Sequence, residues 1–373
     1  MDHLADIDSN WLKRFRRNSL AWYGKHGRDL VWRNSNDAYR VWISEIMLQQ
    51  TTVTAVVPYF ERFLKRFPNI QTLAAANEED VLKYWEGLGY YSRARNIHKT
   101  ACLLVEQQGG QFPDDVAELQ KLPGIGRYTA GAIASFAFNQ RAPIVEANTL
   151  RLYSRLLGYA ENPRSSAGQK LLWEFAEKIL PQKSPGQFNQ AVMDLGATVC
   201  TPKAPSCPHC PVKNCCAAFA NNLQESIPVP AVRPKITHVE EASVAVGKRG
   251  KFLLVKRPEG ERWAGLWDFP RFELPETNGI TAGNYQELEF QLADQFGLET
   301  AIETVVTEIV HSVTRYRIRL YCLQGSVVSG RIKSNGTETA WVSPTRFEEY
   351  PLSVTGRKFA TLLAGSRQHG VEQ

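Results

Sequence analysis

Two glutamates in this 373-residue chain stand where a carboxyl group could act on a substrate. Glu45 lies in VWISEIMLQQT, and its neighbours three and four residues away are Val41, Trp42, Leu48 and Gln49. A helix would place Glu45 on a mostly apolar face, where burial raises the pKa of a carboxyl group and keeps it protonated near neutral pH, as a general acid requires. The alternative is a glutamate held by a structural partner, which is the commoner case for a single acid.

Glu146 stands in PIVEANTLRL, between an apolar run and the predicted start of a helix near Asn148. A carboxylate there could do chemistry on a bound substrate. It could also cap the helix by accepting hydrogen bonds from the N–H groups of the first turn. The stretch by itself leaves both interpretations open.

Four of the seven cysteines fall within 17 residues, at positions Cys200, Cys207, Cys210 and Cys216. So dense a group in an intracellular protein is more typical of metal binding than of disulfides. A zinc ribbon would need two separate C-x-x-C pairs and only one is present, so a single loop around an iron–sulfur cluster is favoured. Zinc and unliganded thiols are the alternatives. The remaining three, Cys102, Cys215 and Cys322, are predicted to be packing residues.

The stretch LPGIGRYTAGA (122–132) predicts a tight turn between two helices. Gly124 and Gly126 would allow positive φ and the close approach of another backbone. The second helix would then begin with outward N–H groups that suit a phosphate. A plain helix–turn–helix corner is the alternative.

Composition limits the class of protein. Apolar residues make up 43% and charged residues 22%, as in globular proteins, and no apolar run approaches the roughly 20 residues that span a bilayer. The opening MDHLADIDSN is unlike a signal or transit peptide, so we expect a cytoplasmic protein with no membrane partner, nucleoid-associated if the source is prokaryotic. The net charge of +6 permits nucleic acid binding without requiring it.

Periodicity predicts two domains. The first 200 residues have the three- and four-residue spacing of helices, with two helices meeting near Pro58 and a helix–turn–helix over 115–138. Beyond residue 236 the period changes to two, which is typical of strands. We therefore expect an all-helical domain over 1–221 with its hairpin at 122–132 and cysteine loop at 200–216, a linker at 222–235, and a smaller α+β domain over 236–373.

The order of these features resembles one family. SEIMLQQT, GLGYYSRARN, LPGIGRYTAGA and the cysteine spacing follow one another, and a strand-rich region comes last. The chain is thus similar to the adenine DNA glycosylases of the MutY type, in the helix-hairpin-helix superfamily that also contains endonuclease III. The likeness is highly specific in the first domain and weaker in the second.

The resemblance implies roles for particular residues. Members of the family bend DNA, flip the target base into a pocket and cleave its glycosidic bond. Glu45 would be the general acid that protonates adenine. The positions that line the adenine pocket correspond to Arg28, Trp32, Leu48 and Gln190. The positions placed against DNA are Gln50 and Tyr90, as wedges that enter the base stack, together with Thr51, Gly124 and Gly126.

The resemblance also bears on the reaction type. Tyr128 stands where the lyase branch of the superfamily carries a Schiff-base lysine, and tyrosine cannot form that imine, which implies a monofunctional enzyme. The family's second catalytic acid belongs to V-D-G-N, which here reads V-E-A-N, so Glu146 replaces Asp, Ala147 replaces Gly, and Asn148 matches. We expect Glu146 to stabilise an oxocarbenium-like transition state or to attack C1′, with an altered geometry because its side chain is one methylene longer.

The C-terminal region resembles the Nudix-like domain that reads 8-oxoguanine in this family. Its predicted helix, QELEFQLADQFGL, lacks the R-E-x-x-E-E carboxylates of a working Nudix hydrolase, which predicts recognition without hydrolysis. Where the family has F-S-H, this chain has Val313, Thr314 and Arg315. Thr314 keeps a hydroxyl for the oxidised guanine, and Arg315 brings a fixed positive charge. With Arg317 and Arg319 it would form a basic stripe along one face of a strand, either following phosphates or merely solvated.

The expected activity is the removal of adenine paired with 8-oxoguanine or guanine in double-stranded DNA, leaving an abasic site. The enzyme would be a monomer and would carry a 4Fe–4S cluster. Three other functions stay open: a glycosylase for another mismatched base, a lesion-binding protein whose catalysis is lost through the changes at 146 and 147, and, least favoured, a nucleotide hydrolase acting through the second domain.

Overall fold

The computed structural model describes residues 3–5, 7–230, 235–275, 279–333 and 336–368, which form two compact units. The first consists of Met1–Ala75 with Asn96–Val232, and the second of Ala76–Arg95 with Arg233–Gln373. The predicted linker at 222–235 falls in part on residues 231–234, which lie outside the described residues. The predicted domain limits remain a prediction.

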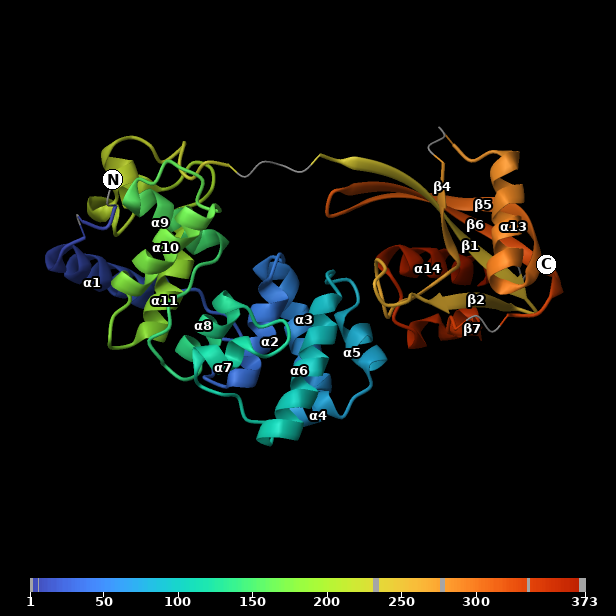
Figure 1. The fold of residues 1–373 in the computed structure, drawn as a ribbon, viewed down its shortest axis with the longest axis horizontal. Coiled ribbons are helices and arrows are strands. Elements are labelled where there is room, and N and C mark those ends of the chain that lie inside the picture. The colour runs from blue at the N-terminus through green and yellow to red at the C-terminus, as the bar shows by residue number, and fades with distance from the viewer. Residues whose placement is uncertain (1–2, 6, 231–234, 276–278, 334–335, 369–373) are drawn as a thin grey trace. The chain divides into compact units, whose positions relative to one another are not determined.

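The regular elements described in the first unit are helices, as predicted (Figure 1). The longer ones are α1 (Ser9–His26), α2 (Ala38–Leu48), α3 (Val53–Arg66), α6 (Ser92–Gln108, which begins in the second unit), α8 (Arg127–Phe136), α9 (Ala147–Leu157), α10 (Ser166–Ile179) and α11 (Pro185–Asp194). The shorter ones are α4 (Ile70–Ala74), α7 (Val116–Gln120) and α12 (Ala217–Ala220), with single turns at Leu195–Val199, Cys207–His209 and Lys213–Cys215.

Side-chain caps fix the start of α2 and of α3. Asp37 caps α2, and Thr52 caps α3. The prediction that two helices meet near Pro58 is wrong, because α2 ends at Leu48, Gln50 adopts a φ of 58°, and Pro58 lies inside α3. The break falls in the polar stretch Q-Q-T-T, where Thr52 supplies the start signal, whereas a single proline removes one backbone hydrogen bond without ending the helix here.

The predicted helix, turn and helix over 115–138 is confirmed by α7 and α8. Close packing around α8 depends on two glycines. A side-chain carbon at Gly131 would collide with the carbonyl oxygen of Pro143, and one at Gly186 in α11 would collide with that of Ser135. Because both positions lack a side chain, α8 approaches α11 and the segment that leads into α9.

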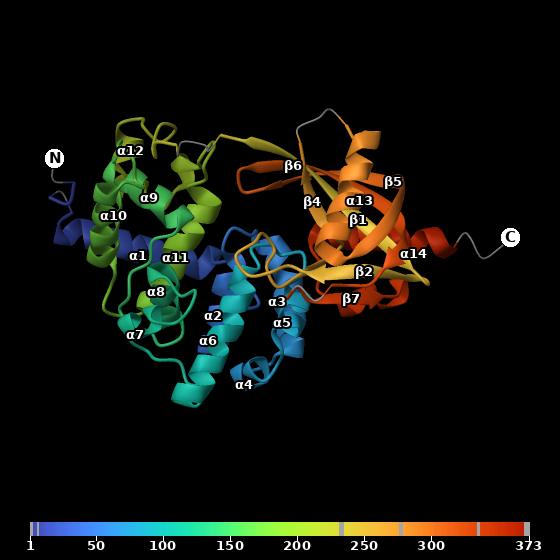
Figure 2. The ribbon, with the colours of Figure 1, turned by 45° about the vertical axis from the view of Figure 1, so that its right-hand side comes forward.

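Seven strands within the described part of the second unit form one mixed sheet (Figure 2). They are β1 (Thr237–Lys248), β2 (Lys251–Lys256), β3 (Trp267–Asp268), β4 (Arg271–Leu274), β5 (Leu298–Val313), β6 (Tyr316–Gly330) and β7 (Thr339–Val342). The order is β3-β2-β1-β6-β5, with β4 paired to β1 and β7 paired to β2. β1 and β6 are parallel, while β5 and β6 form a hairpin whose two-residue turn is Thr314–Arg315.

Helices cover both faces of this sheet (Figure 1). α13 (Ala282–Phe296) packs Leu288 into a core that includes Tyr321, whereas α14 (Val354–Gln368) packs Phe359 into a core that includes Leu320. Successive residues of a strand point to opposite faces, which is why β6 contributes to both cores. The predicted strands and the helix α13 are confirmed, and the short α5 (Glu78–Trp85) lies within the first 200 residues that were predicted to be helical, while α14 was not predicted.

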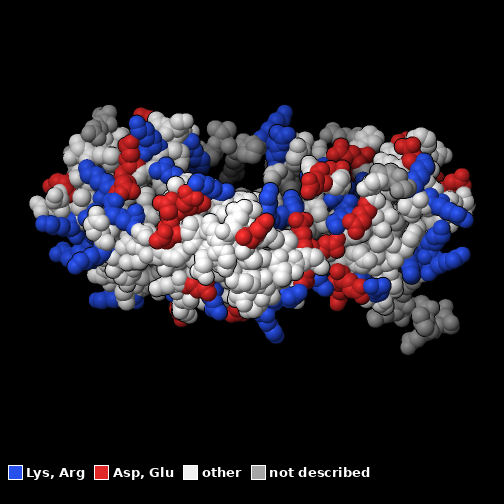
Figure 3. Space-filling view, turned by 60° about the horizontal axis from the view of Figure 1, so that its bottom comes forward, with Lys and Arg blue, Asp and Glu red and all other residues white. Residues whose placement is uncertain are grey.

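Within the described residues, no helix is long and apolar enough to cross a membrane. The face of the molecule in Figure 3 carries Lys and Arg side chains interspersed with Asp and Glu side chains. The net charge of +6 is therefore a modest excess on a surface of mixed charge.

Candidate active site

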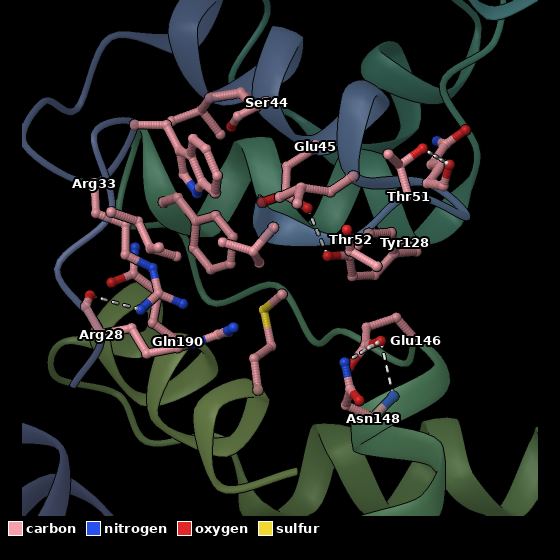
Figure 4. A pocket seen from close by; sticks show the side chains of 18 of the residues that line it. Arg28, Arg33, Ser44, Glu45, Thr51, Thr52, Tyr128, Glu146, Asn148 and Gln190 are labelled. Carbon is pink, nitrogen blue, oxygen red and sulfur yellow. Dashed lines mark hydrogen bonds between the residues drawn. The ribbon is translucent and has the colours of Figure 1, made fainter. Parts of the chain in front are cut away.

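A cavity of about 630 Å³ lies in the first unit, bordered by α2, α8, the start of α9 and α11. It brings together ten residues that the sequence analysis singled out. They are Arg28, Trp32, Glu45, Leu48, Gln50, Thr51, Tyr128, Glu146, Asn148 and Gln190. Figure 4 shows Glu45 hydrogen-bonded to Tyr128 in one part of the cavity and Glu146 beside Asn148 in another. Its volume is in the range of sites that enclose a small ligand.

Glu45 is only 4% exposed. Its Oε2 accepts a hydrogen bond of 2.5 Å from Tyr128 Oη. Burial raises the pKa of Glu45 to about 7, while the hydrogen bond from Tyr128 and the positive charge of Arg33 act in the opposite direction. Burial also raises the pKa of Tyr128 well above its ordinary value, so the hydroxyl stays protonated and donates. Glu45 thus has both the structural partner and the raised pKa that the sequence offered as alternatives.

Glu146 occupies the N-cap of α9. Its Oε2 accepts a 2.8 Å hydrogen bond from the N–H of Asn148, and its Oε1 accepts one of 2.8 Å from the N–H of Thr149. The capping interpretation is therefore confirmed. The same carboxylate lines the cavity, so capping does not exclude a role toward a ligand. Burial raises the pKa of Glu146, whereas the two backbone N–H groups oppose the rise.

Asn148 connects the cavity to the cysteine loop. Its Nδ2 donates to Glu146 Oε2 at 3.2 Å, and its Oδ1 accepts from Arg151 Nη2 at 3.0 Å. The buried Arg151 also donates to the main-chain oxygens of Gly196 and Cys200. Arg151 was missed in the sequence, because an arginine in a helix is usually a surface residue and nothing nearby marks this one as buried.

A buried ion-pair group supports another part of the cavity wall. Asp194, at the end of α11, accepts hydrogen bonds of 2.7 Å from Arg28 Nε and of 2.8 and 2.9 Å from Arg33. Burial alone would raise the pKa of Asp194, but the hydrogen bonds and charges of Arg33 and Arg28 hold it below its ordinary value. Arg33 and Asp194 were missed, although an acid in the apolar stretch QAVMDLG gives the same signal that singled out Glu45.

Two further lining residues are held by neighbours outside the cavity. Tyr23 Oη donates to Gln190 Oε1 at 2.6 Å, which leaves the amide NH₂ of Gln190 as the group able to donate to a ligand. Trp32 is buried and packs edge-on against Phe60 with ring centroids 5.6 Å apart. Both side chains are therefore fixed before a ligand arrives.

The two hairpin glycines differ in their backbone. Gly124 has a φ of 75°, and a side-chain carbon there would lie 2.8 Å from Cβ of Asn96. Gly126 has a φ of −84°, so the expectation of positive φ holds for Gly124 alone. α8 begins after Gly126 without a side-chain cap, and a Cβ at Gly126 would meet nothing within 4 Å. The first N–H groups of α8 can therefore be approached by an anion.

The four predicted cysteine ligands surround one small internal space. Cys200, Cys207, Cys210 and Cys216 line it together with apolar side chains such as Leu152 and Val199. Burial raises the pKa of Cys210 to about 12 and that of Cys216 to about 11. Buried Arg155 donates from Nη1 to Cys200 Sγ at 3.2 Å, which adds positive charge beside the sulfurs.

This donor set fits an iron–sulfur cluster, which thiolates from one compact loop can ligate. Cys215 is not among the described residues around the space, and it accepts a hydrogen bond of 3.3 Å from Arg14 Nε instead. Within the described residues, no three His, Cys, Asp or Glu side chains are grouped to hold a single metal ion.

The second unit has a separate pocket of about 510 Å³. Its lining comes from 89–92, from 261–264, from 311–314 and from the start of α14. Tyr90 is 44% exposed with a φ of 49°, and Thr314 has a φ of 52°, so both stand on left-handed turns. Arg315 is not among the described lining residues, because its guanidinium lies over the ring of Tyr316 and donates to the Tyr316 hydroxyl at 3.1 Å.

Comparison with known proteins agrees with this fold. The sequence profile of the HhH-GPD superfamily of base excision DNA repair proteins matches residues 43–178, and that of the NUDIX domain matches residues 242–362. The structure of a thermostable thymine-DNA glycosylase is 28% identical, covers 58% of this chain and all of its own, and superposes with a TM-score of 0.54. The protein is therefore a DNA glycosylase, a hydrolase of N-glycosyl bonds.

Similar proteins of assigned activity narrow the class. The adenine DNA glycosylase of Rattus norvegicus is 34% identical over 95% of this chain and 78% of its own length. That of Buchnera aphidicola subsp. Acyrthosiphon pisum is 41% identical over 69% of this chain and 74% of its own. That of Homo sapiens is 40% identical over 69% and 48%, respectively. The chain belongs to the adenine DNA glycosylase family.

Replacing Asp194 by Asn leaves the largely buried Arg33 without its counterion, since side-chain exposure is 11% for Arg33 and 0% for Asp194. We expect the free energy of unfolding at pH 7 to fall by about 3–5 kcal/mol. The contribution of the Asp194 carboxylate to the free energy of unfolding is fully present above about pH 3.9, the pKa of an aspartate in the unfolded chain. It is lost as the pH falls through the lower pKa of Asp194 in the folded protein. Urea denaturation of wild type and variant from pH 7 to pH 3 measures both effects.

The matched control is Glu174→Gln, which removes an exposed carboxylate whose partner is Lys170 at 3.9 Å. It should change the free energy of unfolding by less than about 1 kcal/mol. Equal losses in the two variants would contradict a special role for the Asp194 group.

Proposed function

We propose that this protein removes adenine paired with 8-oxoguanine or with guanine from double-stranded DNA, hydrolyses the N-glycosidic bond and leaves an abasic site. The observation that carries the proposal is a single cavity in which a carboxyl group with a pKa near 7, Glu45, shares the lining with a carboxylate on a helix N-terminus, Glu146. An acid and an anion on one ligand are what cleavage of a base from its sugar needs.

Glu45 supplies the proton in this mechanism. Adenine is a poor leaving group as an anion, so protonation of the base by Glu45 makes it leave as a neutral molecule. The Tyr128 hydroxyl holds Glu45 Oε2 and fixes the orientation of the acid. Arg28, Trp32, Leu48 and Gln190 would line the space for the base, with the amide of Gln190 and the guanidinium of Arg28 as donors.

Glu146 stabilises the positive charge that develops on the sugar as the bond breaks. The backbone N–H groups of Asn148 and Thr149 favour its charged form. Hydrolysis by water, without an imine, agrees with the cavity lining, which includes Tyr128 but no lysine among the described residues. The product is then an abasic site with an intact strand.

Binding of duplex DNA would use the uncapped start of α8 at Gly126, where N–H groups can take a phosphate. Gln50, Thr51 and Tyr90 would contact the opened base stack. The pocket of the second unit, lined by Tyr90 and Thr314, would take the 8-oxoguanine, and this unit would recognise without hydrolysing. Arg315 would contact the backbone from outside that pocket. We further propose that the protein acts as a cytoplasmic monomer.

The four cysteines would hold a 4Fe–4S cluster, and Arg155 would offset part of its negative charge. The cluster would fix the loop 200–216 against α9, whose first turn carries Glu146. No chemical step at the base or the sugar is assigned to it.

One observation favours a rival reading. Both carboxylate oxygens of Glu146 already bind the first turn of α9, so the longer side chain could be committed to capping. The protein would then bind a lesion without excising the base. The likeness to a thymine-DNA glycosylase favours a second rival, a glycosylase for another mismatch.

Single-turnover release of the base separates these functions. Wild type should free adenine from duplexes with adenine opposite 8-oxoguanine or guanine, and should free neither thymine nor uracil opposite guanine. Glu146→Gln should lower the rate by about 100-fold or more, because it removes the charge under the sugar. Glu146→Asp restores the charge on a shorter arm, so a faster Asp variant would place the Glu carboxylate off its optimum. Tight duplex binding with no base released would overturn the proposal.

The pH profile tests Glu45 on its own. Because the acid must be protonated, and its pKa is about 7, the rate of adenine release should be level below about pH 6 and fall about tenfold per pH unit above pH 8. Glu45→Gln should abolish most of the activity and, in whatever remains, the pH dependence between 6 and 8. A wild-type profile that stays flat to pH 9 would contradict the assignment of Glu45 as the acid.

Two adjacent cysteines test the cluster. Cys216→Ala should lower bound iron well below the roughly four atoms expected per chain and reduce the visible absorbance of the cluster. Cys215→Ala is the control, because Cys215 bonds Arg14 instead of lining the space. It should keep the iron content of the wild type. Zinc in place of iron in the purified wild type would contradict the cluster.

A further inference from the structure

An ion pair in the second unit joins two segments that are far apart in sequence. Arg357, in the first turn of α14, donates from Nε to Glu86 Oε1 at 2.6 Å and from Nη2 to Glu86 Oε2 at 2.8 Å. Glu86 ends α5, and the turn that follows it carries Tyr90. We call this pair the Glu86–Arg357 clamp.

Residues of the segment that precedes α14 hold the clamp in place. Arg357 Nη1 donates to the main-chain oxygen of Phe347 at 2.8 Å, and Nη2 donates to that of Tyr350 at 2.7 Å. Glu86 Oε2 also accepts from the N–H of Leu352 at 3.3 Å. The side chains of Arg357 and Glu86 are only 27% and 16% exposed. A forked, pre-positioned and half-buried pair of this kind is stronger than an exposed surface pair.

Further contacts hold the same segment. Glu79 in α5 accepts from Lys256 Nζ at 2.6 Å and from Trp267 Nε1 at 3.2 Å. Gly265 has a φ of 81°, and a side-chain carbon there would lie 3.2 Å from Leu82 of α5. These contacts anchor α5 itself. The Glu86–Arg357 clamp holds the end of α5, where the turn begins.

The turn from Glu86 to Tyr91 has an unusual backbone. Gly87, Gly89 and Tyr90 have φ values of 96°, 76° and 49°. Inside the turn, the Tyr91 hydroxyl accepts from the N–H of Gly87 at 3.2 Å. Three of the four residues from Gly87 to Tyr90 are thus left-handed. A tyrosine does not favour this conformation unless its surroundings hold it there, so the path of the chain depends on where the turn is anchored.

The turn forms one wall of the 510 Å³ pocket, and the hairpin turn that carries Thr314 forms another. 8-Oxoguanine differs from guanine by an N–H donor at N7 and an oxygen at C8. Sensing so small a difference requires hydrogen-bonding groups at fixed positions, since a site that relaxes by about 1 Å loses most of its discrimination.

We propose that Arg357 is a positioning residue for lesion selectivity: through Glu86 it fixes the turn that carries Tyr90 opposite the turn that carries Thr314, and so sets the width of the pocket. The inference rests on the proposed function, in which this pocket takes 8-oxoguanine. Arg357 itself does not line the pocket among the described residues. It acts by holding one wall.

The test compares single-turnover adenine release from duplexes with adenine opposite 8-oxoguanine and opposite guanine. Arg357→Gln should lower the ratio of the two rates about tenfold, mostly through the 8-oxoguanine duplex, which corresponds to about 1.4 kcal/mol of lost discrimination. Arg357→Lys keeps the charge and one contact, so its ratio should lie between those of wild type and Arg357→Gln. Glu86→Gln should lower the ratio in the same direction, and the double variant should be no worse than Arg357→Gln alone, because both substitutions remove the same ion pair.

The matched control is Arg346→Gln, which breaks another Arg–Glu pair of the second unit. Arg346 and Glu349 are bonded at 2.6 Å but are 63% and 52% exposed. The rate ratio of this variant should stay within about twofold of wild type. Amide exchange gives a second readout: the amides of Gly87–Tyr91 should exchange about tenfold faster in Arg357→Gln and unchanged in Arg346→Gln.

The outcomes separate the inference from the function it rests on. The rates of the wild type test the proposed function by themselves. A wild type that releases adenine equally fast opposite 8-oxoguanine and opposite guanine would overturn the proposal that the pocket takes 8-oxoguanine. Given a wild-type preference, an Arg357→Gln variant that loses rate equally on both duplexes has a merely structural defect, and the positioning role is overturned. If Arg357→Gln leaves both the rate ratio and the amide exchange of Gly87–Tyr91 unchanged, the positioning role is overturned, and so is the claim that the Glu86–Arg357 clamp fixes the turn.

Discussion

In the proposed mechanism the carboxyl group of Glu45 must still hold a proton near neutral pH, so it has to be kept away from water, and the candidate active-site cavity is arranged around that constraint. Burial at 4% exposure raises the pKa to about 7, but it also requires that the group be hydrogen-bonded. The Tyr128 hydroxyl meets this requirement with a neutral donor, whose hydrogen bond lowers the pKa of Glu45 by less than burial raises it. The positive charge of Arg33 lowers the pKa of Glu45. Arg33 is paired with Asp194, whose negative charge offsets part of this effect.

In the proposed mechanism, the side chain of Glu146 serves both the fold and the chemistry. As the N-cap of α9 it satisfies two backbone N–H groups, and those same groups favour the carboxylate form that a cationic sugar would need. An aspartate would reach less far from the same position. Asn148, in the first turn of the helix, is hydrogen-bonded both to Glu146 and to Arg151. Arg151 in turn donates to the main chain of the cysteine loop. The loop thus supports the wall of the cavity without touching its contents.

The sequence allowed the helical and strand-rich halves and the hairpin to be predicted, because local periodicity and short motifs report on local structure. Most of the cavity residues were predicted from the resemblance to the family instead. It led to a wrong break at Pro58, because a proline in a helix and a proline at its end look alike until the cap at Thr52 is recognised. Arg33, Asp194 and Arg151 could not be assigned in the same way. Their importance lies in ion pairs and hydrogen bonds across up to 166 positions, which only the folded chain brings together. The same holds for Glu86 and Arg357, separated by 271 positions.

The discontinuity of the second unit has a consequence for dividing this chain. Residues Ala76–Arg95 belong to that unit although they are embedded in helical sequence, and they supply one wall of its pocket. A fragment that starts at the first strand, Thr237, would keep the hairpin and Thr314 but would leave Tyr90 behind. The pocket therefore cannot be transferred to another protein as one continuous segment of the chain. Recombination between relatives would preserve it only where both segments are inherited from the same parent.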